Sequence, residues 1–248
     1  MLPLFLSKTA QRAQKMLAEY DYVLTKSQQD FLLFNLKKAA SPQSEDASLL
    51  ETDIDFIFEK DPALVNKQGT EIFLYKSLTL TFLHRIAHQI YKKGDTTSAR
   101  LLSEINREIT GAEIHPGVKI GNSIFIDHPV GFVAGESASI GNRFHGHGQV
   151  LLGSDGINNG VKRHPTISND VTIWPKAIIL GAKTVGNNVI IGAAATITED
   201  VPDNSTVVGY NLLIKEDGIE KRMDLKLYHQ KQFAVLVSEF LFSGVTRS

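Results

Sequence analysis

The apolar residues of the chain follow one rhythm in its first part and another beyond it. The segment 70–95 places apolar residues three and four positions apart, as the buried face of a helix requires, and Gly94 closes the run. Pro62 stands where the first turn of a helix accepts a proline, and the polar stretch 40–48 indicates a loop between helices. The pattern therefore predicts an α-helical domain over residues 1–110.

Beyond this domain the apolar positions recur every six residues. Six consecutive units begin at Ile167 and run to Pro202; each opens with Ile or Val, and all but the one with Lys183 carry an apolar or small residue four positions later. A period of six fits neither a helix nor a lone strand. It is typical of a parallel β-helix, in which each unit makes one short strand and one corner and three units close a coil. Gly and Asn, frequent at the expected corners, tolerate a left-handed backbone.

Together the two rhythms predict the fold class and the domain boundaries. We expect an α+β protein: an N-terminal α-helical domain over 1–110, a left-handed parallel β-helix over 111–215 and a C-terminal tail over 216–248. Within the tail, the segment 224–242 has the amphipathic pattern of a helix. Its apolar residues are expected to pack on the β-helix or on a neighbouring subunit.

The six-residue period fails at two places, and both carry a histidine. Between Ile126 and Ala134 there are two residues too many, and the excess falls around Asp127–His128–Pro129. The segment 153–166 fits no whole unit and ends in Arg163–His164–Pro165. On a repeat scaffold, such irregular segments are where binding residues gather. Because an imidazole beside a carboxylate can take a proton near neutral pH, these breaks favour general-base activation of a hydroxyl group.

Composition narrows the classes of function. The chain has 248 residues, a formal net charge of −1 and no cysteine, which excludes disulfides, thiolate catalysis and Cys-ligated metals. The near-neutral charge gives no electrostatic reason for binding nucleic acid or an anionic membrane surface. No stretch approaches the roughly 20 apolar residues that cross a bilayer, and the N-terminal segment lacks a secretory pattern. We therefore expect a cytoplasmic protein without nucleic-acid or membrane partners.

Other histidines raise the alternative of a metal site. His145 and His147 form an H-x-H pair that could join His128 or His164 in a three-histidine site, but nothing in the spacing makes three ligands converge. His84 and His88, four residues apart on a predicted helix and without the Glu of a zinc-protease motif, indicate packing. We expect no metal.

Two segments closely resemble a known family. The stretch 110–142, with its E-I-H-P, D-H and G-E motifs, and the stretch 162–173, with R-H-P, are similar to serine acetyltransferases of the hexapeptide-repeat superfamily. The resemblance covers residues 55–215 approximately. It implies acetyl transfer from acetyl-CoA, as cosubstrate, to the hydroxyl of L-serine, the first step towards cysteine. It also implies homotrimers with active sites at subunit clefts, often paired into hexamers.

The resemblance implies roles for the residues around the two breaks. His128 would be the general base that takes the proton of the serine hydroxyl, and Glu113 would hold the His128 ring and stabilise its protonated form. Arg163 and His164 match the pair that receives the carboxylate of the substrate and supports the transition state.

The same resemblance implies binding positions. Asp61 and Asp127 match acidic residues that bind the substrate amino acid. Gly153, Ser154 and Ala193 fall where the arm of CoA runs between coils.

Departures from the family pattern leave alternatives open. Gly146 stands where the interior of the β-helix expects an aliphatic residue, and Trp174 and Pro175 replace the small residues that usually let the pantetheine lie close. The sequence ends in "GVTRS", not in the isoleucine that family members insert into the sulfhydrylase, so that complex is not expected. An acyltransferase with a different small hydroxyl or amine acceptor, a metal-dependent hydratase and an inactive scaffold remain alternative functions.

Overall fold

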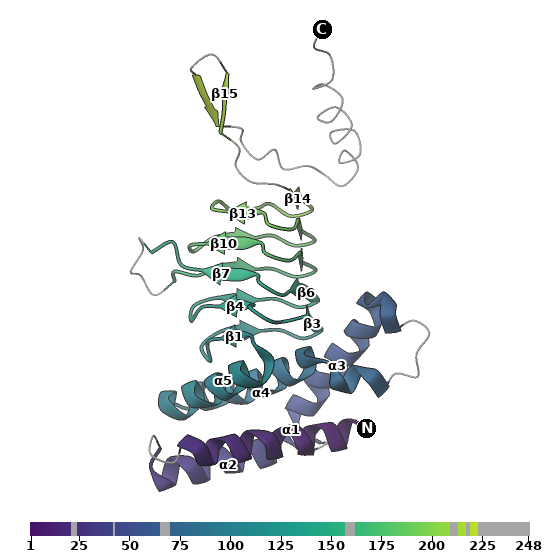
Figure 1. The fold of residues 1–248 in the computed structure, drawn as a ribbon, viewed down its shortest axis with the longest axis vertical. Helices are drawn as coiled ribbons and strands as arrows, with labels where there is room; N and C mark the ends of the chain where they lie inside the picture. Colours follow the sequence, from purple (N-terminus) through teal and green to yellow (C-terminus); the bar gives the residue numbers. More distant parts are fainter. Residues whose placement is uncertain are drawn as a thin grey trace.

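The structure, a computed structural model, describes residues 1–20, 24–41, 43–64, 70–156 and 162–208 and two further strands at 213–216 and 219–222. Helices gather at one end, and stacked coils of short strands rise from them (Figure 1). This arrangement confirms the prediction of an N-terminal helical domain followed by a parallel β-helix.

The helical domain agrees with the predicted pattern except at two boundaries. Its elements are α1 (Leu2–Leu17), η1 (Ala18–Tyr20), α2 (Lys26–Ala39), α3 (Glu45–Lys60), η2 (Pro62–Leu64), η3 (Thr70–Leu74), α4 (Lys76–Lys92) and α5 (Thr96–Thr110). The loop predicted over 40–48 is too long, because the Ser44 side chain accepts the N–H of Ala47 at 3.0 Å and starts α3. The single helix predicted over 70–95 is divided at Tyr75 into η3 and α4.

Fourteen short strands form the three sides of the β-helix, which we call sheets A, B and C. Sheet A contains β1 (Glu113–Ile114), β4 (Val133–Ala134), β7 (Leu151–Gly153), β10 (Ile178–Leu180) and β13 (Thr196–Ile197). Sheet B contains β2 (Lys119–Ile120), β5 (Ser139–Ile140), β8 (Thr166–Ile167) and β11 (Thr184–Val185). Sheet C contains β3 (Ile124–Asp127), β6 (Phe144–His147), β9 (Thr172–Ile173), β12 (Ile190–Ile191) and β14 (Thr206–Val207). The chain visits A, B and C in turn, so all neighbours in a sheet are parallel.

The residue that opens each six-residue unit points into the prism, as the pattern predicted. The buried interior includes Ile167, Val171, Ile173, Ala177, Ile179, Val185, Val189, Ile191, Ala195 and Ile197. Gly146 also faces the interior, and the rings of Phe144 and Phe132 take up the space that an aliphatic residue would fill. A Cβ at Gly146 would lie 2.6 Å from the ring of Phe144.

Asparagines line the corner between sheets B and C. The backbone N–H of Asn122 donates to Oδ1 of Asn142 one coil above, and that of Asn142 donates to Asn169 in the same way. The glycines before Asn122 and Asn142 leave room for this ladder: a Cβ at Gly121 would lie 2.3 Å from Oδ1 of Asn142, and one at Gly141 would lie 2.7 Å from Oδ1 of Asn169. The recurrent Gly-Asn pairs of the sequence are thus a packing requirement.

A buried ion pair fixes the helical domain to the first coil. Arg85 of α4 binds Asp53 of α3, with 3.0 Å between Nη2 and Oδ1, and Asp53 also accepts the backbone N–H of Ile124 at 2.8 Å. Leu80 of α4 belongs to the same buried cluster as the prism interior, so this helix covers the open end of the first coil. The coil that carries Asp127 and His128 therefore rests on a fixed base.

The tail differs in part from the expectation. Strands β15 (Leu213–Glu216) and β16 (Ile219–Arg222) pair in antiparallel fashion, which the sequence pattern did not indicate. The helix predicted over 224–242 lies outside the described residues. Within the described part of the chain, no helix is long and apolar enough to cross a membrane.

Candidate active site

The first register break is a bulged corner that projects His128 outward. His128 has a φ of 46°, a left-handed backbone that costs a non-glycine residue about 1 kcal/mol. Its side chain is 91% exposed, and Nε2 lies 3.6 Å from Oδ1 of Asp127. Gly148, one coil above, is required here because a Cβ would lie 2.3 Å from the carbonyl oxygen of His128. The two extra residues therefore present an imidazole beside a carboxylate.

Asp61 lies on the same side of the molecule, directly after α3. One of its oxygens accepts the N–H of Ala63 at 2.8 Å, and the other accepts the hydroxyl of Tyr75 at 2.6 Å. Burial, the hydrogen bond to Asp61 and the charge of Asp127 raise the pKa of Tyr75. Tyr75 thus stays protonated and is close enough to both carboxylates to feel their charge. The structure brings Asp61, Asp127 and His128 to one side.

A stack of rings stands above Asp127 on sheet C. His147 is in register with Asp127 one coil higher, and the indole of Trp174 lies on its imidazole with 4.7 Å between ring centres. The ring of His145 lies 4.5 Å from that of His147 and stacks on Phe125 at 4.8 Å. Burial, with help from His147, lowers the pKa of His145 to about 4. In the described residues, no group of three or more His, Asp or Glu side chains is arranged to hold a metal.

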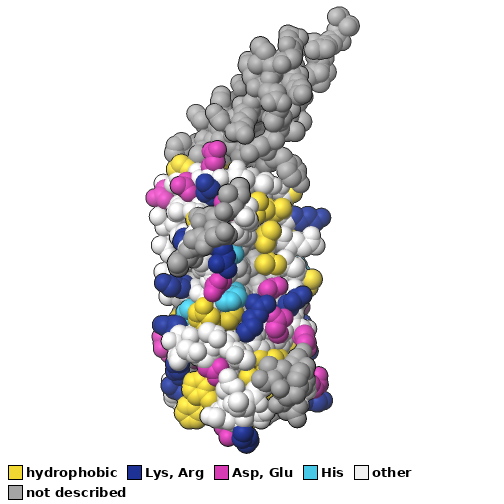
Figure 2. All heavy atoms as spheres, turned by 90° about the vertical axis from the view of Figure 1, so that its left-hand side faces the viewer, with side chains coloured by type: hydrophobic (Ala, Val, Ile, Leu, Met, Phe, Trp, Pro, Cys, Tyr) yellow, Lys and Arg dark blue, Asp and Glu magenta, His cyan; other side chains and the backbone are white. Residues whose placement is uncertain are grey.

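The second register break carries Arg163 and His164. Nη2 of Arg163 lies 2.8 Å from Oε2 of Glu136, whose other oxygen accepts the hydroxyl of Tyr91 at 3.1 Å. Although burial opposes it, these two hydrogen bonds hold the pKa of Glu136 below its usual value. His164 is buried, and its Nδ1 lies 2.9 Å from the hydroxyl of Ser137. Figure 2 shows this face, where basic, acidic and histidine side chains gather beside hydrophobic ones.

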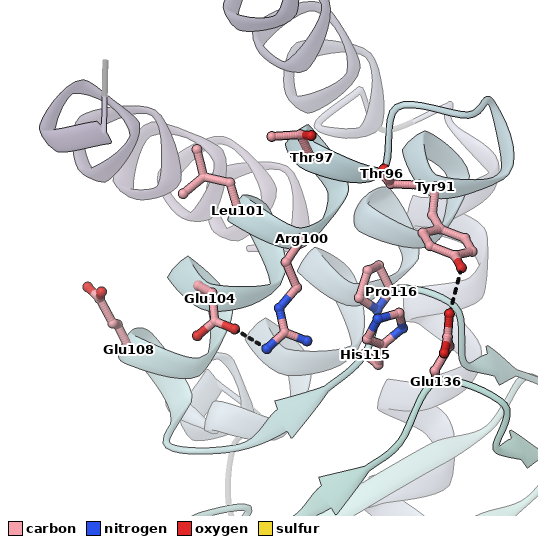
Figure 3. A pocket seen from close by; sticks show the side chains of 10 residues that line it. All are labelled: Tyr91, Thr96, Thr97, Arg100, Leu101, Glu104, Glu108, His115, Pro116 and Glu136. Carbon is pink, nitrogen blue, oxygen red and sulfur yellow. Dashed lines mark hydrogen bonds and ion pairs between the residues drawn. The ribbon is translucent and has the colours of Figure 1, made fainter. Parts of the chain in front are cut away.

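A cavity of about 690 Å³ opens next to this group. It is lined by side chains from α4, α5 and two corners of the β-helix, among them Tyr91, Arg100, His115 and Glu136 (Figure 3). Burial lowers the pKa of His115 in spite of the nearby carboxylate of Glu136. The cavity is therefore lined by both apolar and charged side chains, and one of its carboxylates, Glu136, also binds Arg163.

Glu113 makes contacts that the sequence did not predict. Its carboxylate lies 3.4 Å from Arg100 and 3.8 Å from Arg107, both on α5. Among the ion pairs of the described residues, none joins Glu113 to His128. Its role towards the His128 ring stays a prediction.

Within one chain, the two breaks lie at opposite edges of sheet A. We call them the His128 edge, with Asp127, His128 and Ala193, and the His164 edge, with Gly153, Ser154, Arg163 and His164. The corner of His128 leads into β4, whereas Ser154 follows the last residue of β7 and the ring of His164 lies against Gly135 at the end of β4. One chain therefore does not bring His128 and His164 together, and we call the two groups of residues at these edges the half-sites.

Several residues around these half-sites were not predicted. Tyr75 binds Asp61, Glu136 binds Arg163, and Ser137 binds His164. Each pair is separated by 14 to 27 positions. Such separations carry no periodic signal, because these contacts depend on how coils and helices stack.

The fold and the half-sites together define the class: a parallel β-helix whose regular coils are interrupted at histidine-bearing edges, as in hexapeptide-repeat acyltransferases. Comparison with known proteins identifies the family. The chain is 44% identical over 178 residues to the serine acetyltransferase of Bacillus subtilis, covering 71% of this chain and 81% of that protein. No family model matches the chain.

Solved structures give the same result. The Neisseria gonorrhoeae serine acetyltransferase in complex with serine superposes with a TM-score of 0.65 at 34% identity, covering 71% of each chain. The Brucella abortus serine acetyltransferase in complex with coenzyme A superposes with a TM-score of 0.69 at 28% identity, covering 84% of this chain and 79% of that one. The chain belongs to the serine acetyltransferase family and is an acyltransferase.

Proposed function

We propose that the protein transfers the acetyl group of acetyl-CoA directly to the hydroxyl of L-serine, with His128 as general base. The observation that carries the proposal is the chemistry of the two half-sites. Two carboxylates, Asp61 and Asp127, accompany the base at one side, and a guanidinium, Arg163, accompanies His164 at the other. This set matches the ammonium and carboxylate groups of a small amino acid. Relatives solved with serine and with coenzyme A support the same pair of substrates.

The reaction follows from these groups. The serine hydroxyl gives its proton to His128 as its oxygen attacks the thioester carbonyl, forming a tetrahedral intermediate. The N–H of His164 is proposed to stabilise the negative charge that develops on the carbonyl oxygen of the thioester. The C–S bond then breaks, and the CoA sulfur takes the proton from His128. The products are O-acetylserine and CoA, and the base is restored.

A second copy of the chain is proposed to complete the site. The outward face of sheet A, between the two edges, carries the half-exposed apolar ladder Val133, Leu151 and Ile178. In a cyclic trimer, each subunit can place its His128 edge against the His164 edge of the next, burying this ladder between them. A trimer therefore supplies both half-sites to each cleft, and pairing of trimers through the helical domains gives a hexamer.

The remaining predicted positions have places in this scheme. Gly153 and Ser154 at one edge and Ala193 at the other would line the path of the CoA arm between subunits. Glu113 would stabilise the protonated ring of His128. To do so, its carboxylate would have to leave its ion pairs with Arg100 and Arg107.

One observation favours a different acceptor as the second candidate. Trp174, which stands where the family pattern has a small residue, stacks on His147 above Asp127. This surface could admit another small hydroxyl or amine compound.

A panel of acceptors tests both candidates. The purified protein is incubated with acetyl-CoA and L-serine, homoserine, threonine or small amines, and the released thiol is measured. We expect release with L-serine well above the rate of hydrolysis without acceptor. Release with another acceptor and none with serine would replace the proposal with the second candidate. If calorimetry showed no binding of CoA, both candidates would be contradicted, because each uses acetyl-CoA as the acetyl donor.

A further inference from the structure

Ser137 makes four contacts with the Arg163–His164 pair. Its backbone N–H lies 3.2 Å from Nδ1 of His164, and its hydroxyl oxygen lies 2.9 Å from the same nitrogen. The hydroxyl oxygen also accepts the backbone N–H of Arg163 at 2.9 Å and of His164 at 3.1 Å. A single side chain thus holds both the backbone and the ring of the second register break.

These contacts determine which ring nitrogen carries the proton. A backbone N–H can only donate, so Nδ1 of His164 must be the acceptor. Two N–H groups already occupy the lone pairs of the Ser137 hydroxyl, which leaves its own proton to donate to Nδ1 as well. A neutral His164 therefore carries its proton on Nε2, and Ser137 sets this tautomer.

The surroundings keep the ring neutral and in place. The ring lies against the backbone of Gly135, where a Cβ would be 2.1 Å from Nε2. Burial is the largest cause that lowers the pKa of His164; the charges of Arg163, Lys162 and His115 act in the same direction, and that of Glu136 opposes them. At neutral pH the ring is thus uncharged, and Nε2–H is left as its donor.

We propose that Ser137 is a positioning residue that fixes His164 as the Nε2–H donor for the acceptor carboxylate and the tetrahedral oxygen. The inference rests on the proposed function for the role of His164, but the tautomer itself does not depend on it. Ser137 touches no reacting atom and acts through the imidazole alone.

The test uses the full-length protein with ¹⁵N-labelled histidine and three variants. Ser137→Ala removes the hydroxyl, Ser137→Thr keeps it, and Ser139→Ala is a matched serine substitution two residues away. NMR reports the protonation of each His164 nitrogen and the pKa of the ring. Steady-state kinetics with acetyl-CoA and L-serine report kcat and KM.

We expect the unsubstituted protein to hold His164 in the Nε2–H form. Ser137→Ala keeps the backbone N–H that donates to Nδ1, so the Nε2–H tautomer should persist. Because the variant loses the hydroxyl contacts to the ring and to the N–H groups of Arg163 and His164, it should raise the pKa of His164 towards its ordinary value of 6.5 and lower kcat about tenfold at a little-changed KM for acetyl-CoA. Ser137→Thr should restore both readouts, and Ser139→Ala should change neither. A proton on Nδ1 of the neutral ring in the unsubstituted protein, or an unchanged pKa of His164 in Ser137→Ala, would overturn the inference. If NMR showed the predicted tautomer and pKa of His164 but the protein did not acetylate serine, only the proposed function would be overturned.

Discussion

His128 and His164 stand in opposite surroundings. The side chain of His128 is 91% exposed beside Asp127, whereas His164 is buried, tied to Ser137 and neutral at pH 7. A base must reach the substrate hydroxyl and exchange protons, while a donor works best when its orientation is fixed. The two histidines are therefore suited to different tasks.

Trp174 gives a prediction at the same scale. Its indole is 44% exposed and lies flat on His147 above the His128 edge, where the CoA arm is proposed to run. Trp174→Gly removes this apolar surface, so KM for acetyl-CoA should rise about tenfold while kcat changes little. Initial rates at varied acetyl-CoA provide the measurement. A lower KM would instead mean that the indole obstructs the groove.

His145 links a single ring to the pH dependence of stability. Its pKa is lowered to about 4 from an ordinary 6.5, so the unfolded chain binds more protons between these values. The contribution to stability is complete above pH 6.5 and is lost as the pH falls towards 4, by up to about 3 kcal/mol. His145→Phe, which can stack on Phe125 without titrating, should lose less stability between pH 7 and 5. Denaturant titrations at each pH measure this; parallel losses in both proteins would contradict the assignment.

At the residue scale, the sequence was informative where regularity failed. The histidines at both breaks stood out because every neighbouring unit obeys the six-residue period. Glu136 stood in the G-E motif but received no role, and Tyr75 and Ser137 did not stand out, since each is an ordinary polar residue in its surroundings. Only the stacking of coils and the docking of α4 bring them into contact.

At the scale of elements, the attachment of helices to the first coil is the feature on which the half-sites rest. Asp53 and Arg85 are buried, and removing one charge leaves the other without compensation. Asp53→Asn should lower the free energy of unfolding by about 3–5 kcal/mol. Asp55→Asn, an exposed position on the same helix, should stay within about 0.5 kcal/mol. Guanidinium titration followed by circular dichroism measures both, and equal stabilities would show that the pair is dispensable.

The strands were predictable because each six-residue unit must bury its first residue, whatever lies outside the prism. The way in which the interior is filled at Gly146 was not predictable from the sequence. The space that its missing side chain leaves is taken up by the ring of Phe132, from the coil below, as well as by that of Phe144. The hairpin of β15 and β16 was also missed, since its residues follow neither period.

At the scale of the whole molecule, the proposal is that each chain contributes half of a site at each of the two edges of sheet A. The two edges hold the proposed base, His128, and the proposed donor, His164, apart, and the apolar ladder between them suits a second copy. A shared site would account for the 91% exposure of the His128 side chain in a single chain. It also requires that residues of neighbouring subunits act on one substrate.

Subunit complementation tests this demand most directly. His128→Ala and His164→Ala should each lower kcat by about 10²- to 10⁴-fold as uniform assemblies. Co-expressed with different affinity tags and purified through both, each mixed cyclic trimer contains one cleft with both histidines intact, so activity should return to about one third of the unsubstituted level. Mixed assemblies of His128→Ala with His128→Asn serve as the control and should stay inactive. Mixed His128→Ala and His164→Ala assemblies no more active than their parents would contradict a site shared between subunits.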